Sequence, residues 1–248
     1  MEAADIRMME EMAANAHVAL NIMQYDGWLL RFSAGHTNRA NSVSVLYPST
    51  LDPEEKIKYC ERCYRAQNLP CVFKLTDGDD GLSTILEKRG YRIVTPTDVM
   101  VLDLQDAEMP DGESVFSDQP TEEWLSAYFA FEGLTDPVRQ AVFRRMLEKV
   151  CVRTCYAAVR VNGRIAACAS SAAERGYALL QNIVVDPECR GRGFGRKICR
   201  ALLAEAARAG SERAWLQVVQ TNLPALRLYE SLGFRKKYTY RYMKQANT

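Results

Sequence analysis

A stretch of alternating glycines and basic residues carries the clearest chemical signal in the sequence. Residues 190–197 read Arg-Gly-Arg-Gly-Phe-Gly-Arg-Lys, between an apolar strand-like segment at 177–185 and a helix-like segment. The glycines let the backbone curl so that successive N–H groups face one concavity, and free N–H groups at a helix start attract anions. The segment therefore predicts a pyrophosphate site, with positive charge available from Arg190, Arg192, Arg196 and Lys197.

Two common phosphate-binding motifs do not fit this segment. A Walker loop needs Ser or Thr after its lysine, and here Ile198 follows Lys197. A dinucleotide fingerprint needs a third glycine where Arg196 stands. A solvated basic turn and a short nucleic-acid patch are further alternatives, although no stripe of stacking aromatic residues accompanies the segment.

A second pair of polar residues lies about thirty positions further along the chain. Asn222 stands at the start of an expected helix, and Tyr229 follows seven residues later. Seven residues are close to two helical turns, so both side chains fall on one face. The spacing therefore predicts that the side chains of Asn222 and Tyr229 face the same site.

These two segments resemble the Gcn5-related N-acetyltransferase (GNAT) superfamily. Residues 190–195 are similar to its pyrophosphate loop, Arg/Gln-x-x-Gly-x-Gly/Ala, and follow Ile-Val-Val-Asp-Pro at 183–187, as that family expects. Residues 222–234, Asn-Leu-Pro-Ala-Leu-Arg-Leu-Tyr-Glu-Ser-Leu-Gly-Phe, look like its C-terminal motif. The resemblance is specific from about Ser114 to the C-terminus and weak in the first half.

The resemblance implies transfer of an acetyl group from acetyl-CoA, as co-substrate, to a primary amine by direct attack in a ternary complex. It implies that strand 177–185 splays from the strand beginning at Trp215 and pairs its backbone with the pantetheine arm. One N–H there would stabilise the thioester oxygen. Tyr229 would be the catalytic general acid, and Asn222 would hold the pantetheine or the splay. The implied cofactor-binding residues are Ile183, Val184, Val185, Arg190, Gly191, Arg192, Gly193, Phe194, Gly195, Arg196, Asn222 and Tyr229.

The general base of the reaction is missing from its usual place. Many relatives carry Glu where this chain has Gln217, and an amide does not accept a proton at neutral pH. Glu132, the region of Tyr177 through water, and bulk water are all open as replacements. The missing carboxylate also leaves a second function open, a CoA-binding sensor without turnover.

Composition excludes several classes of protein. The chain has 248 residues, 48% of them apolar, and a net charge of +1, whereas a general nucleic-acid binder usually has a basic excess. No apolar run approaches the roughly 18 residues that span a membrane. The acidic N-terminal segment does not resemble a signal peptide, so we expect a cytoplasmic protein without nucleic-acid or membrane partners. The sequence does not specify the acceptor, which is the amine of a small molecule or of a protein. A homodimer is an open option.

Cysteine and histidine give little support for a metal site. The histidines are His17 and His36, and the motif Cys60-Glu-Arg-Cys63 lies within an expected helix without further ligands. We therefore expect no metal and reduced thiols at Cys60, Cys63, Cys71, Cys151, Cys155, Cys168, Cys189 and Cys199.

The pattern of apolar and turn-forming residues predicts alternating helices and strands. The dipeptide Asn162-Gly163 predicts a tight hairpin, because both residues tolerate positive φ. Expected helices cover Asp5–Ile22, Asp52–Ala66, Leu82–Arg89, Thr121–Phe131, Asp136–Val150, Gly195–Ala209 and Leu223–Leu232. Expected strands cover Gly27–Ser33, Asn41–Tyr47, Pro70–Leu75, Tyr91–Leu104, a segment near Val115, Cys155–Val161, Ile165–Ala172, Tyr177–Val185, Trp215–Val219 and Phe234–Met243.

The two halves share this layout, which favours a duplicated architecture. We predict an α/β fold of tandem acyl-CoA N-acyltransferase-like domains, each with a mostly antiparallel mixed sheet flanked by helices. Residues 1–105 would form a degenerate GNAT-like domain, 106–113 a linker, and 114–248 the catalytic domain. In the first half the corresponding turn, residues 49–56, has three acids and no glycine, so we expect residues 1–105 to bind no CoA.

Overall fold

The computed structural model describes residues 3–106 and 114–245, and the chain folds into two compact units. Of the described residues, the first unit takes those up to Asp98, the segment Ala141–Val150 and those from Tyr238 onward. The second unit takes those within Val99–Gln140 and Cys151–Lys237. Strands β5 (Tyr91–Asp103) and β11 (Arg235–Gln245) contribute residues to both units.

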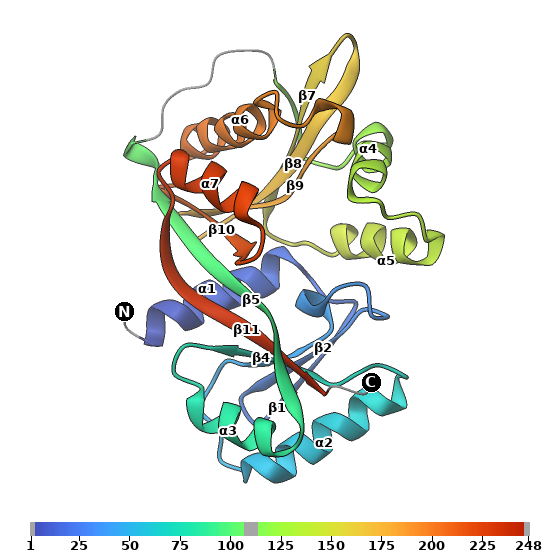
Figure 1. The fold of residues 1–248 in the computed structure, drawn as a ribbon, viewed down its shortest axis with the longest axis vertical. Helices are drawn as coiled ribbons and strands as arrows, with labels where there is room; N and C mark the ends of the chain where they lie inside the picture. The colour runs from blue at the N-terminus through green and yellow to red at the C-terminus, as the bar shows by residue number, and fades with distance from the viewer. Residues whose placement is uncertain (1–2, 107–113, 246–248) are drawn as a thin grey trace. The chain divides into compact units, whose positions relative to one another are not determined.

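The first unit contains a mixed sheet with the strand order β1-β2-β3-β4-β11-β5 (Figure 1). The pairs β1/β2, β2/β3 and β4/β11 are antiparallel, whereas β3 and β4 run parallel with helix α2 as their connection. The remaining elements of this unit are α1 (Ala3–Ala16), β1 (Asn21–Tyr25), β2 (Trp28–Phe32), the short 3₁₀ turn Asn38–Ala40, β3 (Val43–Val45), α2 (Pro53–Ala66), β4 (Val72–Thr76) and α3 (Asp80–Lys88).

Local sequence signals explain how the elements of the first unit begin and turn. Helix α2 starts as predicted, because the Asp52 carboxylate accepts a hydrogen bond from the Glu55 amide at 3.1 Å and Pro53 takes the first helical position. Gly27 closes the β1–β2 turn at a φ of 82°, and a Cβ there would lie 2.5 Å from the carbonyl oxygens of Tyr47 and Pro48. No residue with a side chain fits that turn without a shift of the backbone.

The second unit contains a sheet with the order β5-β10-β9-β8-β7-β6. Strands β6 to β9 pair antiparallel with their neighbours, and β9 pairs parallel with β10 through helix α6. Its other elements are β6 (Ser114–Ser117), α4 (Glu122–Glu132), the first part of α5 (Pro137–Glu148), β7 (Arg153–Val161), β8 (Arg164–Glu174), β9 (Tyr177–Val185), the 3₁₀ turn Pro187–Cys189, α6 (Phe194–Arg208), β10 (Arg213–Val219) and α7 (Leu223–Ser231).

Helices cover both faces of the sheet in the second unit. Tyr156 and Ala157 are neighbours on β7 and therefore point to opposite faces. Tyr156 meets the Trp124 ring of α4 edge to face at 5.1 Å, while Ala157 belongs to the core into which α6 packs. The β7–β8 hairpin turns as predicted at Asn162 and Gly163, whose φ angles are 50° and 79°.

The same order of elements occurs in both units. Three antiparallel strands, a helix and a parallel fourth strand appear as β1-β2-β3-α2-β4 in the first unit and as β7-β8-β9-α6-β10 in the second. The predicted fold class, a mixed sheet flanked by helices, is confirmed.

The first predicted helix was too long. Helix α1 ends at Ala16, and Ile22 lies in strand β1, which pairs with β2 from Asn21↔Phe32 to Tyr25↔Trp28. Pairing with β2 overrides the helical pattern in this segment, because the hydrogen bonds between the two strands satisfy the backbone groups of residues 21–25.

The compact units differ from the predicted division at residues 105 and 114. The end of β11 falls in the first unit because it pairs with β4 from Tyr240↔Thr76 to Lys244↔Val72. The end of α5 falls there too, since Val142 and Met146 share a buried cluster with Ala19 and Ala40. Apart from Asp106, the predicted linker 106–113 lies outside the described residues.

Candidate active site

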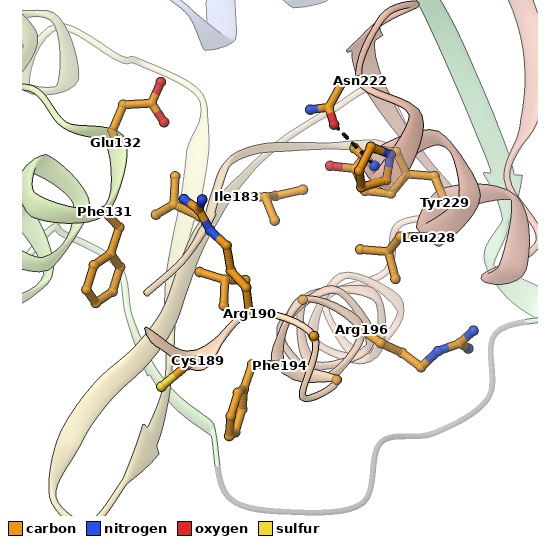
Figure 2. Close-up of a pocket in the computed structure, with 17 residues that line it drawn as sticks. Phe131, Glu132, Ile183, Cys189, Arg190, Phe194, Arg196, Asn222, Leu228 and Tyr229 are labelled. Atoms are coloured by element: carbon orange, nitrogen blue, oxygen red, sulfur yellow. Dashed lines mark hydrogen bonds between the residues drawn. The ribbon is translucent and has the colours of Figure 1, made fainter. Parts of the chain in front are cut away.

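A cavity of about 710 Å³ opens in the second unit beside the end of β9 (Figure 2). Cavities of this size hold cofactors and drug-sized ligands. Its walls come from the end of α4, the end of β9, the loop into α6, and α7. The lining residues are Phe131, Glu132, Ile183, Val184, Val185, Cys189, Arg190, Gly191, Gly193, Phe194, Gly195, Arg196, Asn222, Pro224, Ala225, Leu228 and Tyr229.

Strand β9 leaves β10 before it reaches the cavity. Their parallel ladder consists of Arg213↔Tyr177, Ala214↔Ala178 and Trp215↔Leu179. On the other side, the β8–β9 register shifts between Cys168 and Ser170, and Asn182 takes a φ of 55° at this bulge. The splay that the resemblance implies is therefore present, and the β10-facing edge of residues 183–185 opens to the cavity instead of to another strand.

The loop between β9 and α6 exposes backbone amides at the helix start. Gly191 and Gly193 have φ angles of 73° and 83°, which L-residues with side chains rarely adopt. Gly193 is the N-cap of α6 and supplies no side-chain acceptor. The amides of residues 194–196 thus have no hydrogen-bond acceptor within the part of the chain that the structure describes. Amides of this kind, at the positive end of the helix dipole, are able to bind an anion.

Two of the four basic side chains of the loop line the cavity. Arg190 and Arg196 do so, and the Nη2 atom of Arg196 donates to the Ser231 hydroxyl at 2.7 Å. Arg192 is not among the lining residues, and its guanidinium lies 5.4 Å from the centre of the Phe194 ring. Lys197 does not line the cavity either. The positive charge at the site therefore comes from two arginines.

Asn222 and Tyr229 meet at the α7 side of the cavity, as their spacing predicts (Figure 2). The Asn222 side chain caps α7 by accepting from the Ala225 amide at 3.3 Å. Tyr229 is 8% exposed, and burial raises the pKa of its phenol above the usual value, with a smaller contribution from Cys199. A phenol with a raised pKa stays protonated at neutral pH and is able to donate a proton.

The structure distinguishes the two residue positions considered for a base, Glu132 and the region of Tyr177. Gln217 and Tyr177 do not line the cavity, and the Tyr177 hydroxyl accepts from Nη1 of Arg213 at 2.7 Å. Glu132 does line it, at the last residue of α4 and across the cavity from Tyr229 (Figure 2).

Several lining residues were not expected from the sequence. Phe131 lies outside both motifs, and Leu228 lies within the second motif but has no predicted role there. Leu228 is 3.3 Å from where a Cβ of Gly195 would stand. In the sequence, the only sign of this close contact between Leu228 and the backbone of Gly195 is the glycine itself, since a small residue is needed at position 195. Cys189 also lines the cavity.

The remaining titratable residues form no metal centre. Within residues 3–106 and 114–245, no three His, Cys, Asp or Glu side chains are arranged to hold a metal ion. The eight cysteines are free thiols, and burial raises the pKa of Cys168 and of Cys199 to about 12. No helix in the described ranges is long and apolar enough to cross a membrane.

Comparison with known proteins gives matches along the whole chain. The sequence profile of the family described as "Probable histone acetyltransferase Rv0428c C-terminal" matches residues 3–243. The "uncharacterized N-acetyltransferase YobR" of Bacillus subtilis is 30% identical over 237 residues, which cover 93% of this chain and 94% of that protein. The [ribosomal protein bS18]-alanine N-acetyltransferase of Escherichia coli is 40% identical over 75 residues, which cover 30% of this chain and 51% of that enzyme.

Solved structures show the same fold. A GCN5-related N-acetyltransferase from Kribbella flavida superposes with a TM-score of 0.72 at 16% identity, over 99% of this chain and 96% of that one. A tandem GNAT protein from the clavulanic acid biosynthesis pathway superposes with a TM-score of 0.64 at 15% identity, over 84% of this chain and 76% of that one. The chain therefore belongs to the family of the Rv0428c C-terminal region, within the Gcn5-related N-acetyltransferases, and is an acyltransferase of that superfamily.

Proposed function

We propose that the second unit transfers the acetyl group of acetyl-CoA to a primary amine by direct attack in a ternary complex. The observation that carries this proposal is the cavity at the open edge of β9, where unpaired amides of α6 meet two arginines and Tyr229. The amides of residues 194–196, with Arg190 and Arg196, would hold the pyrophosphate. A pyrophosphate suits these amides, because amides without an acceptor in the protein need an anion or water.

The backbone of residues 183–185 would pair with the pantetheine arm in place of the missing ladder to β10. One amide there would stabilise the negative charge that develops on the thioester oxygen. The amine nitrogen attacks the thioester carbon, the C–N bond forms, and the C–S bond breaks. Tyr229 would give its proton to the departing thiolate, and Asn222 would hold the pantetheine while it caps α7.

The acceptor is proposed as a cationic primary amine of a small molecule or a protein. The bS18-alanine N-acetyltransferase, named for an alanine acceptor, suggests a protein N-terminus as the first candidate. The decisive experiment is an amine panel with acetyl-CoA, read by release of free CoA thiol. The panel should include a peptide with an N-terminal alanine, a lysine peptide and a polyamine. Thermal stabilisation by acetyl-CoA without thiol release for any amine would instead identify a CoA-binding sensor.

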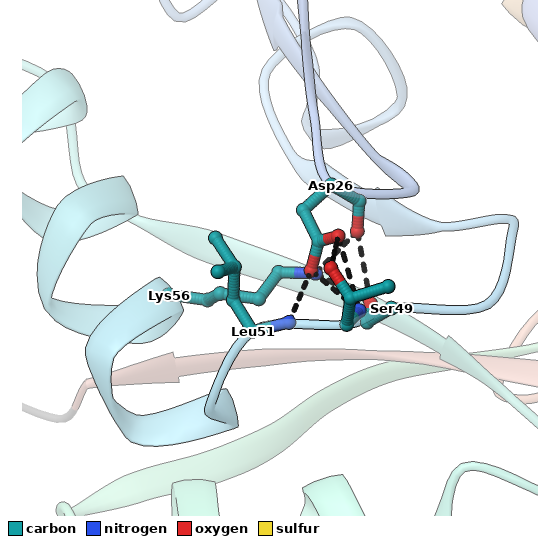
Figure 3. A network of polar contacts seen from close by, with 5 residues as sticks. Asp26, Ser49, Leu51 and Lys56 are labelled. Atoms are coloured by element: carbon teal, nitrogen blue, oxygen red, sulfur yellow. Dashed lines mark hydrogen bonds and ion pairs between the residues drawn. The ribbon is translucent and has the colours of Figure 1, made fainter.

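We further propose that the first unit binds no CoA, because one of its own carboxylates occupies the corresponding turn (Figure 3). Between β3 and α2, the amides of Thr50 and Leu51 donate to the Asp26 carboxylate at 3.0 and 2.9 Å. Lys56, which is fully buried, lies 3.0 Å from the same carboxylate. The Leu51 amide, together with Lys56 and Thr50, holds the pKa of Asp26 well below its usual range. Calorimetry should give one CoA per chain, and two sites would contradict the proposal.

A further inference from the structure

Glu132 is an exposed acidic side chain at the wall of a cavity whose other charges are positive. Among the residues that line the cavity it is the only carboxylate, and Arg190 and Arg196 are the only basic residues. No hydrogen bond or ion pair joins Glu132 to any residue in the described ranges. Figure 2 shows it on the α4 side of the cavity, opposite Asn222 and Tyr229.

The position of Glu132 contradicts the usual preference of helix ends. It is the last residue of α4, which Gly133 caps with a φ of 70°. The C-terminus of a helix carries partial negative charge, so a carboxylate there is disfavoured and a cation is favoured. The last turn of α4 contains no basic residue that compensates. Local conflicts of this kind are expected where function, not stability, selects the residue.

The carboxylate and the helix end together create a site for a cation at one wall of the cavity. The amines that the proposed reaction uses are ammonium ions at neutral pH, and they must lose a proton before they attack. The amide of Gln217 is unable to take that proton, and its position does not line the cavity. Glu132 is a carboxylate at the cavity, and neither Arg190 nor Arg196 forms an ion pair with it.

We propose that Glu132 binds the ammonium group of the acceptor and accepts a proton from it, and this inference rests on the proposed function. One ammonium proton passes to the Glu132 carboxylate, and the neutral amine attacks the thioester carbon. A second proton leaves the nitrogen to water as the C–S bond breaks, while the thiolate takes the Tyr229 proton and water restores it. Glu132 then returns its proton to solvent, which regenerates the carboxylate. The products are the amide, CoA thiol and one proton released to solvent. The other ionisable groups of the cavity are Cys189, Arg190, Arg196 and Tyr229.

The test compares Glu132→Gln and Glu132→Asp with the matched control Glu212→Gln, an exposed residue of the second unit that lies outside the cavity. Methylamine and the best amine of the panel serve as charged acceptors, and hydroxylamine serves as an acceptor that is neutral at pH 7. We expect Glu132→Gln to lower kcat/KM for charged amines by about 100-fold, at the low end of general-base effects, and to change the hydroxylamine rate by less than about threefold. Glu132→Asp should restore part of the loss.

Three further measurements separate this role from a structural one. CoA affinity should be unchanged, and the Tm of Glu132→Gln should equal or exceed the wild-type Tm, because the charge at the helix end is removed. The rate with charged amines should rise about tenfold per pH unit in Glu132→Gln, where only free amine reacts, and less steeply in the wild type. Equal rates for wild type and Glu132→Gln would overturn this inference alone. Absence of thiol release from the wild type with every amine would overturn the proposed function, and this inference with it.

Discussion

The proposed anion site at the start of α6 makes a quantitative prediction for Gly193→Asp. Gly193 has a φ of 83°, and a Cβ at that position would meet no atom within 4 Å. The substitution therefore causes no clash, and its structural effect is the strain of a side chain in the left-handed region, about 1–2 kcal/mol. Asp tolerates that region better than most residues, so we expect the variant to fold.

The new carboxylate would stand beside the amides of residues 194–196, where a pyrophosphate is expected. Two charges about 5 Å apart interact with roughly 3 kcal/mol at an effective dielectric constant near 20. Because about 1.4 kcal/mol corresponds to a factor of ten, Gly193→Asp should weaken CoA binding by at least about 100-fold. Gly193→Asn is the matched control, since it has the same shape and the same backbone strain without the charge.

Calorimetric titration with CoA and with pantetheine tests this reasoning. Pantetheine lacks the pyrophosphate, so its affinity should be the same in the Asp and Asn variants. CoA should bind to Gly193→Asn and fail to bind to Gly193→Asp over the same range. If the two variants bound CoA within about threefold of each other, the assignment of this loop to the pyrophosphate would be refuted.

Three further predictions concern the phenol, the helix cap and the buried thiols. Tyr229→Phe should lower kcat about 10- to 100-fold without changing CoA affinity, and an unchanged rate of thiol release would remove the phenol from the mechanism. Asn222→Ala should lower the free energy of unfolding by about 1 kcal/mol in urea titrations through loss of the bond to the Ala225 amide; no loss would mean that this cap is not formed in solution. Burial raises the pKa of the Cys168 and Cys199 thiols to about 12, whereas unfolded thiols ionise near pH 8.5. The unfolded chain therefore loses these protons first, and the free energy of unfolding should fall by roughly 1.4 kcal/mol per pH unit for each thiol above about pH 8.5. Urea titrations in which Cys199→Ala keeps the full wild-type slope would contradict the assignment for that thiol.

The parts of the fold that depend on short-range chemistry were predictable from the sequence. The cap at Asp52 and the hairpin at Asn162-Gly163 appear where the sequence places them, because both involve only residues adjacent along the chain. Strand β1 was missed because its apolar pattern continues that of α1, and only its pairing with β2 decides between helix and strand. The pairing of β11 with β4 joins residues more than 160 positions apart, and no local pattern encodes it.

In the candidate site, too, some residues are predictable from local sequence signals and others depend on long-range packing. Gly193, Asn222 and Tyr229 carry motif or spacing signals, and the structure brings all three to the cavity. Phe131 and Glu132 reach it only because α4 packs against β8 and β9, which is a property of the folded unit. The sequence offered Glu132, the region of Tyr177 and bulk water as sources of a base, and of the two residues only Glu132 lines the cavity.

The chain contains two parallel strand–helix–strand crossovers, and they differ in whether the turn before the helix finds its hydrogen-bond acceptor within the protein. Both β3–α2–β4 and β9–α6–β10 place the amides of a helix start after a strand end. In the first, the Asp26 carboxylate from the β1–β2 turn accepts from the Thr50 and Leu51 amides just before α2, and the buried Lys56 neutralises it. Asp52 caps the helix itself, so the turn is satisfied within the protein. In the second, glycines at positions 191 and 193 leave the amides without an internal acceptor. These amides need water or an anion from outside, and the residues that would hold such an anion are those that the cavity exposes.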